Sequence, residues 1–273
     1  MPYASTSTIR LSKTRSVNSD IRIELDNWFA RANADFVQND PISIPHRFSS
    51  HQDIEISAFF AAIMSWGNRK TIIAKAANLM ERMDFKPHDF VQNARPSDLK
   101  RISGFVHRTL NATDVLFLID FMKSHYLRSA SLETAFFPVP NSNIDAVEQG
   151  LQFFHNQVFN VEYPSLRTRK HISYPGSGSA CKRLNMFLRW MVRPDDNNID
   201  FGLWKNIKPQ QLICPLDVHV HRVSLELGLI NRKQADWKSA MELTEQLRKL
   251  DALDPVKYDL ALFNMGVQKR ITS

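Results

Sequence analysis

The chain has 273 residues, of which 43% are hydrophobic and 23% charged, enough for one large globular unit or for two lobes around a buried core. Its 35 Lys and Arg residues against 28 Asp and Glu residues give a formal net charge of +7, which favours an anionic partner such as nucleic acid. With only two cysteines, Cys181 and Cys214, the chain cannot supply a disulfide framework or a four-cysteine metal or iron–sulfur site.

The first nineteen residues contain Arg10, Lys13 and Arg15, many Ser and Thr residues and no acid. This composition predicts a flexible basic arm over residues 1–20, although an organelle transit peptide has a similar composition. No apolar run approaches the roughly 20 residues that a membrane helix requires, so no membrane partner is expected. The sequence therefore predicts a cytoplasmic protein, associated with the nucleoid if its partner is DNA.

Helical periodicity dominates the rest of the chain and alternating strand patterns are scarce, which predicts an all-α fold. From Asp53 to Trp66, apolar residues recur at three- and four-residue steps and predict a buried core helix. A second helix should follow the turn at residues 67–70, where Arg69 either contacts a phosphate or lies in a solvated loop. Further helices are expected at residues 112–126, 143–159, 182–193, 218–227, 236–250 and 255–267.

A polar segment at residues 194–198 follows the helix that starts at residue 182, and it predicts a division between two parts of the chain. We therefore expect two helical lobes around a cleft. Residues 53–194 should form a helical bundle, and residues 21–52 and 195–273 should form a second lobe from both ends of the chain.

The segment from Pro175 to Ser179 has the order Pro-Gly-Ser-Gly-Ser, a permissive turn before a helix. The backbone amides of Gly176, Gly178 and Ser179 could converge there on a phosphate group. Lys182 lies at the start of the following helix, on a face apart from the apolar stripe. The same face carries Asn185, Met186, Arg189 and Arg193, so the helix itself need not bury the lysine.

Asp217 lies in the segment Pro-Leu-Asp-Val-His-Val, at the start of another predicted helix. An aspartate there is a good helix cap and a lysine on a helix is most often solvated, so both residues also have purely structural interpretations. An amine and a carboxylate that face one cleft are, however, a pair that can attack a sugar carbon and stabilise positive charge. His219 and His221 are two residues apart and diverge on a helix, so no metal site is expected.

The lysine helix, together with residues 215–220, resembles the corresponding segments of the 8-oxoguanine DNA glycosylases of the helix-hairpin-helix DNA glycosylase superfamily. The stretch from residue 53 to residue 267 also resembles a bacterial family of unassigned function. That family in turn resembles the archaeal-type 8-oxoguanine glycosylases more than other branches of the superfamily. This resemblance implies that Lys182 attacks the deoxyribose C1′ and forms a Schiff base. It also implies that Asp217 assists base departure and that His219 touches the DNA backbone.

The same resemblance implies a pocket for an extruded purine. Asp259 and Phe263 lie one helical turn apart and would hold the base, with Met186 and Arg189 nearby on the lysine face. Phe263 also continues an apolar stripe with Val256, Leu260 and Val267, so packing alone explains it at least as well.

Three features depart from the family pattern. The position two residues after the final glycine of the turn is Ala180 rather than lysine, and Lys182 and Asp217 are 35 positions apart. The cysteines of an iron–sulfur cluster after Asp217 are missing, so neither this cluster nor another cofactor is expected.

The resulting prediction is a two-lobed, all-α DNA glycosylase with AP lyase activity. It would act as a monomer on an oxidised purine such as 8-oxoguanine in double-stranded DNA. Two alternatives stay open. One is a DNA-binding protein of the same fold without catalysis, and the other is a monofunctional glycosylase for alkylated bases, in which Asp217 activates water.

Overall fold

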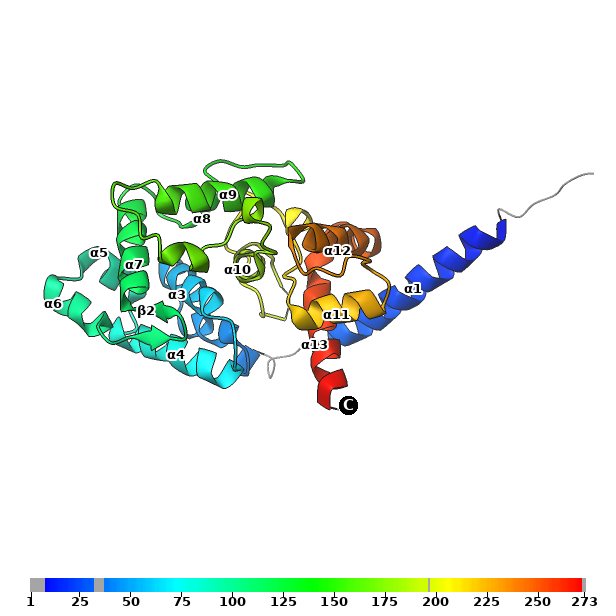
Figure 1. Cartoon of the computed structure of the whole chain (residues 1–273), viewed down its shortest axis with the longest axis horizontal. Helices are drawn as coiled ribbons and strands as arrows, with labels where there is room; N and C mark the ends of the chain where they lie inside the picture. Colours follow the sequence, from blue (N-terminus) through cyan, green and yellow to red (C-terminus); the bar gives the residue numbers. More distant parts are fainter. Residues whose placement is uncertain (1–7, 32–36, 196, 272–273) are drawn as a thin grey trace, which may run out of the picture.

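The computed structural model describes residues 8–31, 37–195 and 197–271. Within these residues the chain is mostly helical, and the only strands described form one short hairpin, so the predicted all-α class is confirmed. The helices gather in two groups with α10 (Lys182–Val192) between them, as Figure 1 shows.

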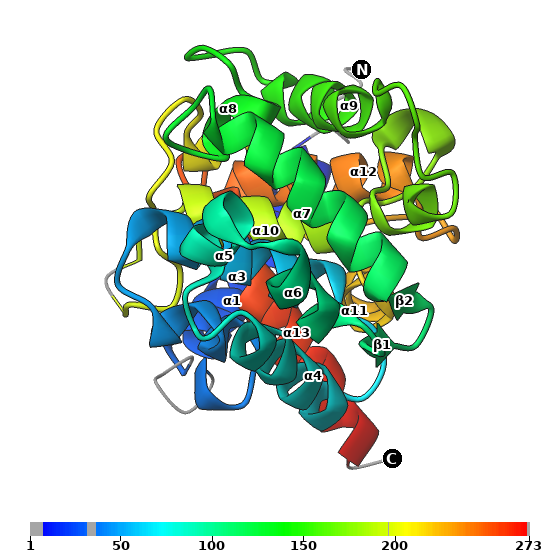
Figure 2. The same ribbon diagram turned by 90° about the vertical axis from the view of Figure 1, so that its left-hand side faces the viewer.

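The first group comes from the first part of the chain, and Figure 2 looks onto it, with α7 crossing in front of the other helices. Its helices and strands are α3 (His51–Ile63), α4 (Arg69–Arg82), α5 (Pro87–Asn93), α6 (Pro96–Leu99), β1 (Val106–His107), β2 (Leu110–Asn111), α7 (Ala112–Tyr126), α8 (Glu133–Phe136) and α9 (Ala146–Phe159). β1 and β2 are antiparallel, with His107 opposite Leu110.

The second group joins the two ends of the chain. It contains α1 (Thr8–Ala30), α11 (Val218–Glu226), α12 (Trp237–Leu250) and α13 (Tyr258–Ile271). α1 packs against α13, and the Tyr258 hydroxyl donates a 2.9 Å hydrogen bond to Asp26 Oδ1. Of the arm predicted over residues 1–20, residues 8–20 are helical in α1, and residues 1–7 lie outside the described residues.

Short 3-10 helices connect these elements. They are η1 (Pro41–Ser43), η2 (Pro45–Arg47), η3 (Lys100–Ile102), η4 (Thr168–His171), η5 (Pro175–Ser177), η6 (Pro209–Gln211) and η7 (Pro255–Lys257). η1 and η2 pack against α3, whereas the sequence predicts that residues 21–52 belong to the second lobe. The chain therefore enters the first group before residue 53.

α10 is the centre of the molecule and is buried along nearly its whole length. On one side it packs against α3, where the Phe187 ring meets the edge of Phe59 at a centroid distance of 5.6 Å. The opposite face, which the sequence suggested could be solvated, is also buried, and Asn185 and Arg189 on it are 1% and 3% exposed. Carboxylates from other segments meet the basic residues of that face, which the periodicity of a single helix cannot indicate.

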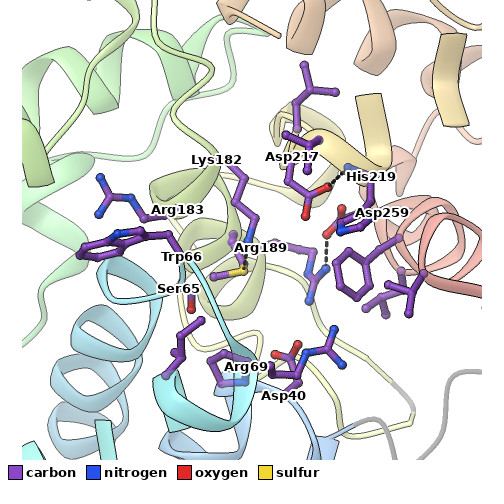
Figure 3. Close-up of a pocket in the computed structure, with 18 of the residues that line it drawn as sticks. Asp40, Ser65, Trp66, Arg69, Lys182, Arg183, Arg189, Asp217, His219 and Asp259 are labelled. Carbon is purple, nitrogen blue, oxygen red and sulfur yellow. Dashed lines mark hydrogen bonds and ion pairs between the residues drawn. The ribbon is translucent and has the colours of Figure 1, made fainter. Parts of the chain in front are cut away.

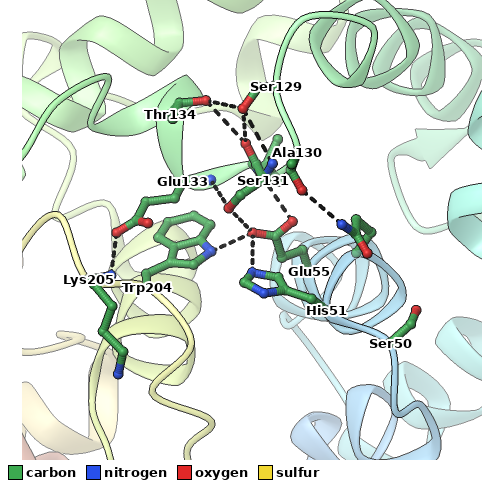
Figure 4. A network of polar contacts seen from close by, with 12 residues as sticks. Ser50, His51, Glu55, Ser129, Ala130, Ser131, Glu133, Thr134, Trp204 and Lys205 are labelled. Carbon is green, nitrogen blue, oxygen red and sulfur yellow. Dashed lines mark hydrogen bonds and ion pairs between the residues drawn. The ribbon is translucent and has the colours of Figure 1, made fainter.

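A buried carboxylate ties three distant segments together, as Figure 4 shows. Glu55 on α3 is fully buried and accepts hydrogen bonds from Tyr126 Oη at 2.8 Å, Ser131 Oγ at 2.5 Å, Leu132 N at 3.0 Å and Trp204 Nε1 at 2.6 Å. Glu55 Oε1 also lies 3.1 Å from Nε2 of the His51 ring. Burial alone would raise the pKa of Glu55, but the hydrogen bonds outweigh burial and lower this pKa.

Candidate active site

A cavity of about 710 Å³ opens where α10 faces α11 and α13, and Figure 3 shows the side chains that enter it. Eight of the residues singled out in the sequence line this cavity: Arg69, Lys182, Met186, Arg189, Asp217, His219, Asp259 and Phe263. They come from four helices and from the cap of α11, and they are up to 194 positions apart, so only the tertiary structure brings them together.

Lys182 begins α10 after a residue in an unusual conformation. Cys181 has φ +50° and ψ +30°, the left-handed region, and its N–H donates to Ser179 Oγ at 3.1 Å. The Lys182 ammonium donates to Met186 Sδ at 3.2 Å, and a thioether is a weak acceptor. Within the described part of the chain, no carboxylate forms an ion pair with Lys182. A ligand in the cavity can therefore reach this amine without displacing a counterion.

Asp217 caps α11 and lines the cavity at the same time. Its Oδ1 accepts from the backbone N–H groups of His219 at 2.8 Å and Val220 at 2.9 Å. Both bonds go to the same oxygen, so the second oxygen can face a ligand while the cap stays intact. The predicted capping role of Asp217 is therefore present, and it is compatible with a role in the cavity.

Asp259 is an unusual carboxylate because it is 7% exposed and forms an ion pair with Arg189, which is itself buried. Arg189 also pairs with Asp200, with a 3.3 Å distance between Nε and Oδ1. Burial raises the pKa of Asp259 to about 6, against the opposing effect of Arg189. Burial disfavours the charge of Arg189, but Asp200 and Asp259 outweigh burial and raise its pKa, so the guanidinium stays charged.

The ring of Phe263 contacts Arg69 and His219. The Arg69 guanidinium carbon lies 5.0 Å from the ring centroid, and the His219 and Phe263 rings are nearly perpendicular, with their centroids 6.0 Å apart. Val256 and Leu260 of the predicted apolar stripe are buried, whereas Phe263 is half-buried and lines the cavity. Arg69 also connects α4 of the first group to α13 of the second across the cavity.

The turn before α10 does not line the cavity, although it was predicted to hold a phosphate. The Gly178 N–H donates to Pro175 O at 2.8 Å inside the turn, so this amide is already used. Ser179 pairs with Asp236 in an isolated antiparallel bridge, and its Oγ accepts from Cys181 N. Gly176, Gly178 and Ser179 therefore do not line the cavity, and the phosphate contact of this turn stays a prediction.

Asp40, Trp66 and Arg183 also line the cavity and are not among the predicted site residues. Asp40 caps η1 through a 3.1 Å bond from Ile42 N to its Oδ1, and burial raises its pKa. Trp66 follows α3, and the Arg183 guanidinium carbon lies 4.8 Å from its ring centroid. Spacing gave no signal for Asp40 or Trp66, because both enter the cavity from segments outside α10.

The described residues contain no group of three or more His, Cys, Asp or Glu side chains that could hold a metal ion. No helix in the part of the chain that the structure describes is long and apolar enough to cross a membrane.

Comparison with protein families matches residues 40–268 to the family described as "Protein of unknown function (DUF2400)". No curated protein and no solved structure matches the chain. No helix-hairpin-helix or glycosylase family is identified, so the predicted assignment to the helix-hairpin-helix DNA glycosylase superfamily is wrong. The matched residues include all the cavity residues, and the chain belongs to the DUF2400 family of unknown function.

Proposed function

We propose that the protein is an enzyme that removes a damaged base from DNA, with Lys182 as the nucleophile and an associated AP lyase activity. The observation that carries the proposal is that Lys182, whose amine bonds only weakly to Met186 Sδ, and the Asp217 carboxylate line one cavity. The proposal rests on this geometry and on the charge of the chain, and not on membership of a glycosylase family.

The reaction begins with an extruded nucleotide in the cavity. The Lys182 ammonium first loses a proton to solvent, and the resulting amine attacks C1′ of the sugar as the bond between C1′ and the base breaks. Asp217 stabilises the positive charge that develops on the sugar, and the departing base takes up the proton that the attacking nitrogen releases. Opening of the sugar ring then gives a Schiff base between Lys182 and C1′. Loss of a proton from C2′ of this intermediate expels the 3′ phosphate and cleaves the strand.

The other end of the cavity supplies contacts for the base. The half-buried Phe263 ring offers a surface for stacking, and the Asp259 carboxyl can hydrogen-bond to polar atoms of a purine edge. Because burial raises the pKa of Asp259 to about 6, this carboxyl can donate a hydrogen bond in weakly acidic solution and accept one in neutral solution. An oxidised purine such as 8-oxoguanine has both donors and acceptors on its edges, and it is the base we propose.

The hydrogen bonds of Asp217 are also compatible with an alternative function. Because Oδ1 of Asp217 already has a structural role as the cap of α11, its presence is also compatible with a DNA-binding protein that performs no chemistry. In that case Lys182 would contribute charge only, and no covalent intermediate would form.

Borohydride trapping separates these possibilities. The substrate is a DNA duplex that carries 8-oxoguanine opposite cytosine, and the proteins are the native chain, Lys182→Ala and, as a matched control, Lys249→Ala, a change at an exposed lysine on α12. We expect a covalent adduct with the native chain and with Lys249→Ala, and none with Lys182→Ala. Binding without an adduct or base release would favour the non-catalytic competitor, and base release without an adduct would favour a monofunctional glycosylase.

A further inference from the structure

Basic side chains border the cavity on the side of the hairpin β1–β2. We define the basic rim as Arg108, Arg167, Lys170 and Arg183. Gly67 lines the cavity, and a Cβ atom at this position would lie only 2.6 Å from Arg108 Nη1. The Arg108 guanidinium therefore packs against the cavity wall at Gly67.

Hydrogen bonds connect the rest of the rim. Arg167 Nη2 donates to the carbonyl of Thr109 in the hairpin at 2.7 Å. Arg183 Nη2 donates to the carbonyl of Lys170 at 3.2 Å, and Arg183 itself lines the cavity. The hairpin, the loop before η4 and the first turn of α10 thus form one continuous border.

The rim has an excess of positive charge. Arg167 pairs with the buried Asp114 at 3.0 Å, whereas in the described residues Arg108, Lys170 and Arg183 take part in no ion pair. Arg108, Arg167 and Lys170 are exposed, and Arg183 is half-buried over Trp66. Burial lowers the pKa of Arg183 to about 10, so it remains a cation in neutral solution.

Two buried histidines contact Trp66 close to the rim. The ring of His107 lies 5.0 Å from that of Trp66, and the ring of His171 lies 5.8 Å from it. Burial is the main cause that lowers the pKa of both histidines, of His171 to about 4, and Arg108 at His107 and Arg183 and Lys170 at His171 act in the same direction. At His171 the opposing effect of Asp114 is larger than that of either cation.

The backbone at Arg108 supports a role for its side chain. Arg108 has φ +54°, a left-handed conformation that costs a residue with a Cβ about 1 kcal/mol and that glycine or asparagine adopts more readily. The hairpin turn therefore holds an exposed arginine at a position where a smaller residue would fit better. Strain of this kind is a reason to look for a function of the side chain.

We propose that the basic rim binds the phosphate backbone of duplex DNA and so presents one nucleotide to the cavity. The proposal rests on the proposed function for the identity of the polymer. A row of four cations, three of which form no ion pair in the described residues, suits the regularly spaced charges of a phosphate backbone better than it suits a single anionic group.

Exposed apolar side chains in the loop before Arg167 fit the same partner. Tyr163 is 83% exposed and Leu166 is 67% exposed, and both precede the basic run at residues 167–170. Aromatic and aliphatic groups beside cations can pack on sugars or bases. Tyr163→Ala should therefore weaken DNA binding but leave its salt dependence unchanged.

Fluorescence anisotropy with an undamaged 20-base-pair duplex, titrated at several salt concentrations, tests the rim. Arg108→Asn suits the left-handed backbone, so it removes the charge without unfolding the hairpin, and Lys170→Ala removes a second exposed cation. We expect each change to weaken binding and to reduce the slope of log K against log salt by about 0.9, and the double change by about 1.8. Lys249→Ala should leave the slope unchanged, and thermal unfolding should show that all the variants are folded.

The outcomes separate the rim from the proposed chemistry. If the native chain binds the duplex and the double variant binds it with the same slope, the rim is not the DNA surface, although the role of Lys182 could still be correct. If the native chain fails to bind the duplex, the rim proposal is overturned. If the slope falls as expected while borohydride trapping gives no adduct, the rim proposal stands and the enzymatic proposal fails.

Discussion

At the scale of single residues, the cavity changes the chemistry of Asp259. Its buried carboxyl forms an ion pair with the buried cation Arg189, while the acids Asp217 and Asp200 repel its negative charge. Burial raises its pKa from 3.8 to about 6, which means that the folded state holds a proton more tightly than the unfolded state. Asp259 therefore favours folding in acidic solution, and this contribution is lost as the pH rises through about 6.

This effect can be measured by urea unfolding of the native chain and of Asp259→Asn between pH 4.5 and 7.5. We expect the stability of the native chain relative to the variant to decrease by about 2 kcal/mol over this range, because only the native chain titrates at this position. The test rests on the direction in which this stability difference changes with pH, because the variant also loses the ion pair with Arg189 at every pH. A difference in stability that does not change with pH would contradict the raised pKa of Asp259.

At the scale of elements, the candidate active site is built from the beginnings of helices. α10 begins with Lys182 and α11 is capped by Asp217, so the local structure of two helix starts fixes where the amine and the carboxylate lie. The sequence predicted both helices, because apolar periodicity and capping residues are local signals. It did not predict the hairpin at residues 106–111, whose two-residue strands are too short to show an alternating pattern.

Two substitutions at Asp217 separate its cap from its proposed chemistry. Asparagine accepts the same backbone hydrogen bonds without charge, so Asp217→Asn should keep the stability of the chain but lose most of the base-removal activity. Asp217→Ala should lose the same activity and also about 1 kcal/mol of stability. Chemical denaturation and a base-release assay on the same preparations test this, and full activity in Asp217→Asn would exclude a role for the negative charge.

At the scale of the whole molecule, long-range contacts decide what the sequence could not reveal. The buried polar face of α10 is an example, because the acids that neutralise Arg189 lie 11 and 70 positions further along the chain. The cavity residues Asp40 and Trp66 were missed for the same reason. The helical class, by contrast, needs only local periodicity and was predicted correctly.

Glu55 is the long-range contact that we expect to matter most for stability. Glu55→Gln would place an amide N–H₂ among groups that donate to the native carboxylate, and it should cost about 2 to 4 kcal/mol. Glu148→Gln, a change at an exposed glutamate of α9, is the matched control and should cost little. Since the pKa of Glu55 is lowered, its contribution should be complete above pH 4.5 and should disappear as the pH falls below that value. Equal losses of stability in the two variants would contradict this role.

The unequal bonding of Lys182 and Asp217 has an evolutionary consequence. Selection for a stable α11 would keep aspartate or asparagine at position 217 in a descendant that had lost its activity, because the cap is needed for folding. Lys182 contributes only a weak bond to a thioether, so a descendant without activity would be free to replace it. Across related chains, the lysine is therefore the more informative marker of retained chemistry, and the aspartate alone says little.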